Sequence, residues 1–238
     1  RRRSPPHPRA SASASAFARR RPGMGDAVGG VAGPQSEAAP PRPQLDYDDE
    51  ARKLWARLNF DPASFGRGPT AYNPLDALWR HPESGAIFYV GNQPAASNLG
   101  LLERYQVTHV VNCTSNMPMY HESSGKITYF RFDIFNHYYE VGGDEDAVRF
   151  VAPVLEFIGN ALAQGHSVMA HCLAGAHRAG TTGCICLMHF AQLGAKEAVA
   201  TAKRMRPIID PIGEFPELLA KVERGWNKRR AANAGPAH

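Results

Sequence analysis

The sequence predicts an α/β fold in which a single central, mostly parallel sheet is flanked by helices on both faces. Two observations support this prediction. Short apolar segments rich in β-branched residues, such as 107–112, alternate with amphipathic helical segments, such as 144–163. The 238 residues are 43% hydrophobic and include 3 Trp, 8 Tyr and 11 Phe, which is enough to fill one sizeable core.

The first predicted element is an amphipathic helix over Asp46–Leu58, with acidic residues leading and basic residues trailing, as the helix dipole favours. Leu54, Trp55 and Leu58 form its apolar face. Pro and Gly interrupt the chain after this helix. We therefore expect residues 45–84 to form a helix and an irregular extension that packs on the main domain.

The main domain is predicted over residues 85–226, followed by a flexible C-terminal tail at 227–238. Its strands are β-branched or apolar runs, and its helices have one apolar face. The predicted strands are 87–90, 107–112, 127–132 and 167–170. The predicted helices are 95–105, 144–163, 179–190, 196–205 and 215–222.

Residues 1–44 form a separate basic tail, rich in Pro, Ala and Ser, which we predict to be disordered. Two interpretations of this tail stay open. It has the composition of an organelle transit peptide, which would direct the protein to a plastid or mitochondrion, or it is an extension upstream of a true start at Met24. Without a transit peptide we expect a cytoplasmic or nuclear protein.

Charge and cysteine content exclude several classes of function. The tail accounts for the net charge of +5, because residues 45–238 carry 19 basic and 20 acidic side chains. Nucleic-acid binding by the folded part is therefore not expected. No apolar run approaches the roughly 20 residues of a membrane span, so no membrane association is expected. Four irregularly spaced cysteines predict neither a disulfide scaffold nor a metal site, and we expect a monomer.

The most informative window is 168–183, VMAHCLAGAHRAGTTG, in which a strand ends at His171-Cys172 and Arg178 opens a helix. Backbone N–H groups of such a loop can converge at the helix N-terminus to bind an anion. Arg178 adds a planar fork for two phosphate oxygens, and Gly175 allows a turn with positive φ. The same field stabilises the thiolate of Cys172, a nucleophile beneath a bound phosphate. The predicted phosphate-binding residues are Leu173, Ala174, Gly175, Ala176, His177 and Arg178.

The pattern His171-Cys172-x5-Arg178 resembles the active-site signature of cysteine-dependent protein tyrosine phosphatases. Residues 85–98, 107–119 and 203–223 resemble the dual-specificity branch, closest to MAP-kinase-phosphatase-type domains. This resemblance implies hydrolysis of phosphate monoesters on Tyr and Ser/Thr of phosphoprotein substrates, through a phosphocysteine at Cys172. It implies no metal and no organic cofactor, and it gives His171 a role in orienting the loop by hydrogen bonding.

Two departures from the family pattern concern the catalytic steps. Ala179 stands where the family usually has Ser or Thr, whose hydroxyl helps the thiolate leave when water cleaves the phosphocysteine. Asn136 stands where the resemblance places a catalytic Asp, and an amide cannot donate a proton to a leaving alkoxide. Asp133 is the predicted substitute, and a site without a functional acid is the alternative. Further candidates are Glu140, Asp144 and Asp146, although acids in the first turn of a helix also stabilise the helix itself.

These departures keep two other functions open. A pseudophosphatase would bind phosphate with Cys172 and Arg178 but turn over weakly. A glucan phosphatase is the second alternative, because plant glucan phosphatases of the same superfamily also carry Ala at the place of Ala179.

Two more side chains near the signature have predicted roles. Cys113 follows the strand at 107–112, and resemblance to the lipid-phosphatase branch implies a reversible disulfide between Cys113 and Cys172. A buried, inert thiol is the alternative for Cys113. His177, within the signature loop, is expected to face solvent.

Overall fold

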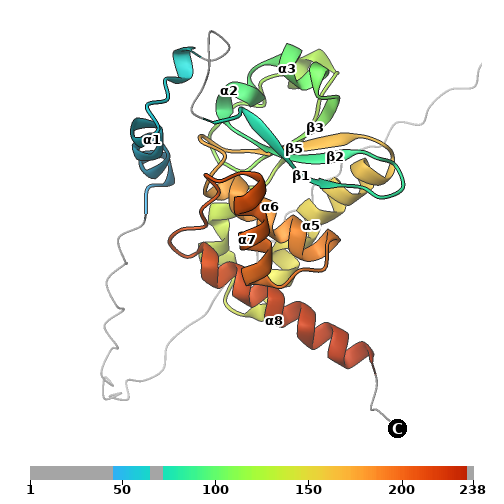
Figure 1. Ribbon diagram of the computed structural model, residues 1–238. Helices are drawn as coiled ribbons and strands as arrows, with labels where there is room; N and C mark the ends of the chain where they lie inside the picture. The colour runs from blue at the N-terminus through green and yellow to red at the C-terminus, as the bar shows by residue number, and fades with distance from the viewer. Residues whose placement is uncertain (1–44, 65–71, 235–238) are drawn as a thin grey trace, which may run out of the picture. The chain divides into compact units, whose positions relative to one another are not determined.

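The computed structural model describes residues 45–64 and 72–234 (Figure 1). The predicted tail at 1–44, with both of its interpretations, lies outside the described residues. The strands are β1 (Leu75–Arg80), β2 (Ile87–Gly91), β3 (Val107–Asn112), β4 (Thr128–Arg131) and β5 (Ser167–His171). The helices are α1 (Tyr47–Arg57), α2 (Gln93–Ala96), α3 (Leu99–Arg104), α4 (His137–Glu140), α5 (Asp144–Ala163), α6 (Arg178–Phe190), α7 (Ala195–Met205) and α8 (Phe215–Asn233). Short 3-10 helices lie at Pro62–Ser64, Glu122–Ser124 and Ile134–Asn136.

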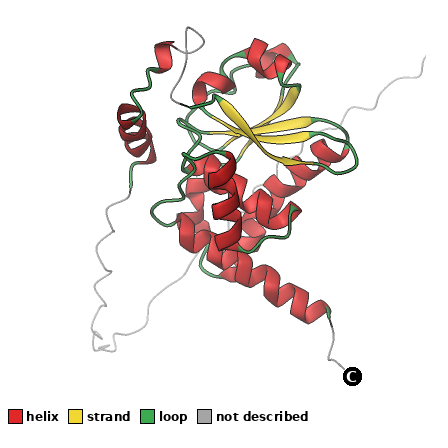
Figure 2. Ribbon diagram, viewed as in Figure 1, coloured by secondary structure: helices red, strands yellow, loops and turns green. Residues whose placement is uncertain are grey.

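One five-stranded sheet lies at the centre, in the order β1-β2-β5-β3-β4 (Figure 2). The four strands from β2 to β4 are parallel, and β1 pairs antiparallel with β2 at the edge. Since β5 lies between β2 and β3, its last residue His171 is in register with Gly91 and Asn112. The predicted mostly parallel sheet is therefore confirmed, and the signature loop leaves from the carboxyl end of its middle strand.

Different helices cover the two faces of the sheet. Phe88 and Val90 of β2 belong to a large core shared with α5, α6 and α8, whereas Tyr89 between them packs with residues of α2 and α3. This alternation follows from the two-residue period of a strand. Figure 1 shows α2 and α3 on one side of the sheet and α5 to α8 on the other, so the prediction of helices on both faces is confirmed.

Helix α6, which follows the signature loop, is buried from Arg178 to Met188. Gly183 lets this helix approach the sheet closely, because a Cβ atom there would lie 2.7 Å from Leu78 and 2.9 Å from Val90. Such close packing on the sheet fixes where the helix begins. The N-terminus of α6 is therefore held at the carboxyl edge of the parallel strands.

The sequence analysis missed β1, whose residues it placed in the irregular extension. The register between β1 and β2 shifts between Ala77 and Trp79, so the strand lacks the simple alternation that sequence patterns detect. The remaining predicted elements have boundaries within one residue of the structure, except for the two described next.

The single helix predicted at 95–105 was wrong, because two short helices, α2 and α3, cover this stretch. The side chain of Asn98 accepts a hydrogen bond from the Leu101 N–H at 3.0 Å and caps α3. Asn favours such a cap over a helix interior, since its side chain competes with the helical backbone bonds.

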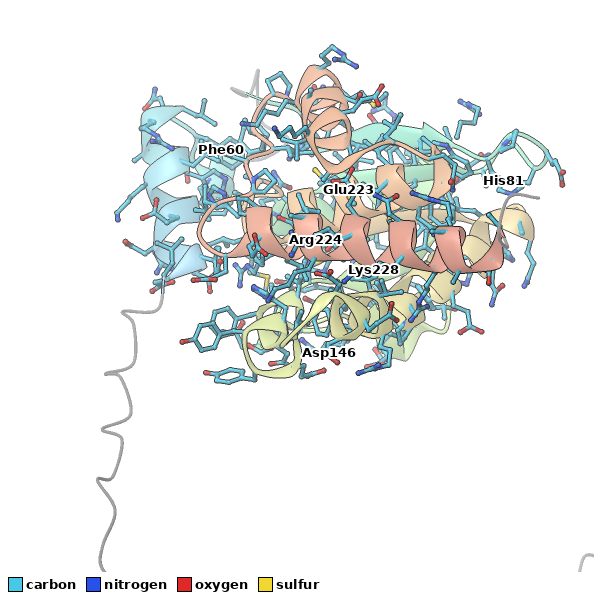
Figure 3. All side chains as sticks on the ribbon, turned by 90° about the horizontal axis from the view of Figure 1, so that it is seen from below. Phe60, His81, Asp146, Glu223, Arg224 and Lys228 are labelled. Carbon is cyan, nitrogen blue, oxygen red and sulfur yellow. The ribbon has the colours of Figure 1, made fainter. Side chains whose placement is uncertain are left out.

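The flexible tail predicted from residue 227 was also wrong for residues 227–233, because α8 continues to Asn233. On α8, Arg224 donates a hydrogen bond to Asp144 at 3.0 Å, and Lys228 donates to the same carboxylate at 2.7 Å. Figure 3 shows Arg224 and Lys228 on α8, beside the first turn of α5, where Asp146 is labelled. These ion pairs hold the C-terminal half of α8 against α5.

Among the described residues, no helix combines the length and the apolarity that a membrane span requires.

Replacing Asn98 with Ala tests the cap that separates α2 from α3. We expect Asn98→Ala to lower the free energy of unfolding by about 0.5–2 kcal/mol, because the Leu101 N–H loses its acceptor. Urea denaturation followed by circular dichroism measures this change. Arg104→Ala, an exposed position in α3, is the control and should change the stability by less than about 0.5 kcal/mol. Equal stability of the two variants would contradict the proposed capping role.

Candidate active site

The signature loop lies between the end of β5 and the start of α6. Cys172, the first residue after β5, has only 2% of its surface exposed, and Arg178 is the first residue of α6. The site is therefore built from rigid elements on both sides, and only residues 173–177 form the turn between them.

The carbonyl groups of this turn point away from its centre. Each of the four carbonyls from Leu173 to Ala176 accepts a hydrogen bond from a residue outside the turn. The pairs are Leu173 O with Gln93 N–H (2.9 Å), Ala174 O with Arg206 Nη2 (3.3 Å), Gly175 O with Arg206 Nε (2.9 Å) and Ala176 O with Asp210 N–H (3.1 Å).

The N–H groups of the turn therefore point inward. In a trans peptide the N–H lies opposite the preceding carbonyl, and the described residues contain no cis peptide bond. The four outward carbonyls thus turn the N–H groups of residues 174–177 toward the centre of the loop. Between described residues, no hydrogen bond has a backbone N–H of residues 173–178 as its donor. This ring of unused donors matches the anion site that the sequence predicted.

Gly175 adopts the conformation that the sequence analysis predicted, with φ of +68°. A Cβ atom at this position would lie 2.4 Å from the carbonyl oxygen of Gly91 and 2.9 Å from Nη2 of Arg206. Glycine is therefore required both by the backbone angle and by the close approach of two neighbours.

Arg206, at the end of α7, organises the turn from behind. Its side chain is fully buried, donates to two loop carbonyls and pairs with Asp76 of β1 at 2.6 Å. Burial lowers the pKa of Arg206, and Asp76 opposes this shift. Sequence reasoning had assigned no role to Arg206 or Asp76, because the two lie 130 residues apart and only the fold brings them together.

Arg178 is nearly buried and holds its guanidinium beside Cys172. Burial lowers the pKa of Arg178, but Cys172 and Asp48 outweigh that effect and raise the pKa above its usual value. One terminal nitrogen, Nη2, donates a hydrogen bond to the carboxylate of Asp48 in α1. The buried Nε atom has no hydrogen-bond partner among the described residues. An anion in the loop would supply that missing acceptor.

Helix α1 covers one side of the loop. Ala51 and Trp55 of α1 pack in a small apolar cluster with Leu173, Ala174 and Ala176 of the turn. The expectation that residues after Asp46 pack on the main domain is thus confirmed for α1. The acids at its start were interpreted as favourable to the helix dipole, and nothing in the local sequence marked Asp48 as a neighbour of Arg178.

The two histidines of the signature are both buried. The expectation that His177 faces solvent was wrong, because it is 5% exposed and its Nδ1 lies 2.7 Å from the carbonyl oxygen of Asp210. Burial lowers the pKa of His171 to about 3, so this side chain is neutral near pH 7. Neither ring nitrogen of His171 has a hydrogen-bond partner among the described residues, and its predicted role in orienting the loop stays a prediction.

The residues after β4 that the sequence analysis considered as acids have different hydrogen-bond and ion-pair partners. Asn136 is half-buried at the end of a 3-10 turn, and the carboxylate of Asp133 accepts a hydrogen bond from the Phe135 N–H of its own loop at 3.3 Å. Asp144 pairs with α8, and Asp146 pairs with Arg149. The last two acids therefore stabilise helices, whereas a catalytic role for Asp133 stays a prediction.

The hydroxyls that follow Arg178 donate to backbone carbonyls. Ala179 is fully buried. The Thr181 hydroxyl donates at 2.7 Å to the carbonyl of His177, the last residue of the turn, and the Thr182 hydroxyl donates at 3.1 Å to the carbonyl of Arg178. The thiol of Cys113 lies 3.4 Å from the Thr182 hydroxyl. Burial raises the pKa of Cys113 to about 12, which favours an unreactive thiol. Both Cys113 and Cys172 are free, and the disulfide stays a prediction.

No group of three or more His, Cys, Asp or Glu side chains within residues 45–64 and 72–234 is arranged to hold a metal ion.

Comparison with known proteins identifies the family. Residues 88–225 match the dual specificity phosphatase catalytic domain. The chain belongs to this family. The matched region begins in β2, ends in α8 and includes the whole signature loop, so the recognised residues and the geometry of the site agree.

The similar proteins carry corresponding names. Over 136 residues the chain is 31% identical to human dual specificity protein phosphatase 9, covering 57% of this chain and 34% of that protein. It is 28% identical to Arabidopsis thaliana dual specificity protein phosphatase 1 over 138 residues, covering 57% and 65%. The fold is similar to that of human DUSP28, with a TM-score of 0.52, 21% identity and coverage of 65% and 96%. The chain spans about a third of the length of the first curated relatives it matches.

Adding a methyl group at Gly175 tests the role of the loop in catalysis. We expect Gly175→Ala to reduce kcat on an aryl phosphate by about 10²–10³, because the clash with Gly91 displaces N–H groups that should stabilise the transition state. The matched control is Gly165→Ala, which also has positive φ but has no atom within 4 Å of the added Cβ. Near-normal kcat in both variants would show that the turn does not bind the transferred phosphoryl group.

Proposed function

We propose that this chain hydrolyses phosphate monoesters on Tyr and Ser/Thr side chains of proteins, through a phosphocysteine at Cys172. The observation that carries this proposal is the ring of inward N–H groups at residues 174–177, closed by Arg178. Membership of the dual specificity phosphatase family supports the same conclusion.

The first chemical step is transfer of the phosphoryl group to sulfur. The thiolate of Cys172 attacks phosphorus, the S–P bond forms, and the bond from phosphorus to the ester oxygen breaks. Charge on the three equatorial oxygens is stabilised by the loop N–H groups and by Arg178. Because burial keeps His171 neutral near pH 7, the positive charge beside the sulfur comes from the Arg178 guanidinium and not from an imidazolium.

The second step returns the sulfur to its thiolate form. Water attacks the phosphocysteine, the S–P bond breaks, and inorganic phosphate leaves. Ala179 offers no hydroxyl to the departing sulfur, and the neighbouring Thr181 and Thr182 hydroxyls donate to the helix backbone. We therefore expect this step to limit kcat.

Room for the residues that flank a phosphorylated side chain lies beside the loop. A surface groove of about 830 Å³ is lined by Pro62, Gln93, Pro94, Tyr120 and His121, among others. Gln93 connects groove and site directly, because its N–H donates to Leu173 O in the signature turn. A groove of this size next to the cradle fits an extended peptide better than it fits an isolated small phosphate.

Replacing Cys172 with Ser tests the proposed function. We expect Cys172→Ser to lower turnover of p-nitrophenyl phosphate and of a phosphotyrosine peptide by at least about 10³, because the alkoxide needed for attack does not form near neutral pH. Binding of inorganic phosphate, followed by calorimetry, should persist. Acid-quenched wild-type reactions should yield a Cys172 peptide heavier by one phosphoryl group.

Cys184→Ser is the matched control for this experiment, because Cys184 is an equally buried thiol in α6 outside the loop. It should keep turnover near the wild-type level. Undiminished turnover in Cys172→Ser, with no phosphorylated Cys172 peptide in the wild type, would contradict the proposed function.

Restoring a hydroxyl at position 179 tests which step limits turnover. We expect Ala179→Ser to raise kcat by roughly 2–10-fold, because one hydrogen bond to the leaving sulfur contributes about 0.5–1.5 kcal/mol. Rapid-quench kinetics with p-nitrophenyl phosphate should show a burst in the wild type that shrinks in the variant. The rate of the burst itself is the internal control and should not change. A wild type without a burst would place the slow step before phosphocysteine hydrolysis.

A further inference from the structure

Within residues 45–64 and 72–234, no hydrogen bond or ion pair joins an acid of the 133–146 segment to the signature turn. Asn136 occupies the place of the expected acid, and Asp133 is hydrogen-bonded within its own loop. Departure of an alkoxide from phosphoserine or phosphothreonine needs a proton in the transition state. If the chain hydrolyses such esters, another acidic side chain must reach the phosphate.

Asp48 is the acid that the fold brings to this position. Its carboxylate accepts a hydrogen bond from Nη2 of Arg178, the residue that holds the phosphate oxygens. The Asp48 side chain is 26% exposed and that of Arg178 is 9% exposed, so the carboxylate is the more solvent-accessible member of the pair. In an in-line displacement the ester oxygen leaves opposite the attacking sulfur, and because Cys172 is buried, it leaves toward the more accessible part of the site.

Contacts at both ends of α1 fix the position of Asp48. At the start of the helix, Tyr47 stacks on Phe215 with ring centres 4.6 Å apart, and Asp46 accepts hydrogen bonds from the N–H groups of Asp48 and Asp49. At the other end, Trp55 donates a hydrogen bond to Tyr72, which donates to the loop carbonyl of Ala174 at 3.4 Å. The helix is thus attached to the signature turn itself.

The guanidinium of Arg178 has room for both Asp48 and a phosphate. Its Nε atom, buried and unpartnered among the described residues, lies on the same edge of the guanidinium as Nη2. A phosphate oxygen bound at Nε would therefore lie beside the carboxylate of Asp48. Two negative groups so close repel each other, and a proton shared between them removes this repulsion.

We propose that Asp48 of α1 is the general acid of the first step and the general base of the second, and this proposal rests on the proposed function. As the thiolate of Cys172 attacks, the Asp48 proton moves to the ester oxygen, and the alcohol leaves neutral. The Asp48 carboxylate then takes a proton from the attacking water, the S–P bond breaks, and the thiolate and inorganic phosphate are released. Asp48 thereby regains its proton, and no other reactant is needed.

Several charged groups surround this end of α1. They are Arg178 and Cys172 of the loop, Glu214 before α8, and, on α1 itself, Asp46, Asp49, Glu50, Arg52 and Lys53. Lys53 pairs with both Asp49 and Glu50, whereas the carboxylate of Asp48 is the partner of Arg178.

The test compares Asp48→Asn with the wild type on two esters. On a phosphoserine peptide we expect kcat/KM to fall by about 10²–10⁴, because the alkoxide leaves without a proton. On p-nitrophenyl phosphate, whose leaving group is a weak base, the fall should be less than about tenfold, since general acid catalysis adds little there. The decline of wild-type kcat on the alkaline side, from loss of the Asp48 proton, should disappear in the variant.

Two further variants serve as controls. Asp49→Asn changes the neighbouring carboxylate, which pairs with Lys53 at 2.8 Å, and should leave the rates on both esters near the wild-type level. Asp48→Glu keeps an acid at the same position and should retain the alkaline decline even if its rate is lower. Thermal unfolding of each variant shows that the rates refer to folded protein.

Other outcomes would overturn the proposal. Faster turnover and tighter inorganic phosphate binding in Asp48→Asn would mean that Asp48 blocks the site. Equal losses on both esters would mean that it only orients Arg178. If Cys172→Ser abolishes turnover but Asp48→Asn keeps the wild-type ratio between the esters, the proposed function stands and only the role of Asp48 fails. If wild-type turnover does not depend on Cys172, the proposed function itself fails.

Discussion

The orientation of four peptide groups in the signature turn is the constraint on which the site depends. A short turn with free N–H groups inside needs all its carbonyls satisfied outside, since buried carbonyls without partners are costly. Arg206 satisfies two of them, and the backbone of Gln93 and Asp210 satisfies the others. The anion site is therefore maintained by residues that never touch the phosphate. Arg206 is fixed in turn by Asp76, so the edge strand β1 contributes to a site at the opposite side of β2.

Because of this constraint, the conformation of the loop depends on its contacts with the sheet. Gly175 comes so close to Gly91 at the end of β2 that neither backbone can shift without displacing the other. The close packing of α6 at Gly183 fixes the far end of the loop in the same way. The turn is therefore held between the carboxyl edge of the parallel strands and the start of a buried helix. Open α/β folds commonly bind ligands at this edge of the sheet. A preorganised cradle of this kind needs little rearrangement when charge develops on the phosphoryl group.

Local sequence patterns predicted those parts of this arrangement that depend on residues close together in the chain. The strands at 107–112 and 167–170, the helix at 144–163 and the Cys172 to Arg178 spacing follow from short-range periodicity and spacing, and the structure contains all of them. What the sequence did not reveal depends on contacts between distant residues. His177 is buried because Asp210 covers it, and Asp48 meets Arg178 across 130 positions. The register shift in β1 and the cap at Asn98 show that small local irregularities also defeat periodic patterns.

Electrostatic attraction connects α1 with the start of α6 at this site. A cation at the N-terminus of a helix is unfavourable, because the helix dipole presents positive charge there. Arg178 occupies that position in α6, next to inward N–H groups that add to the positive field. An anion next to Arg178 is therefore favourable, and without substrate the carboxylate of Asp48 provides one. When a phosphate dianion arrives, the substrate neutralises the same positive field in place of the Asp48 carboxylate. In the proposed mechanism, the contact that stabilises the free site also places Asp48 next to the bound phosphate.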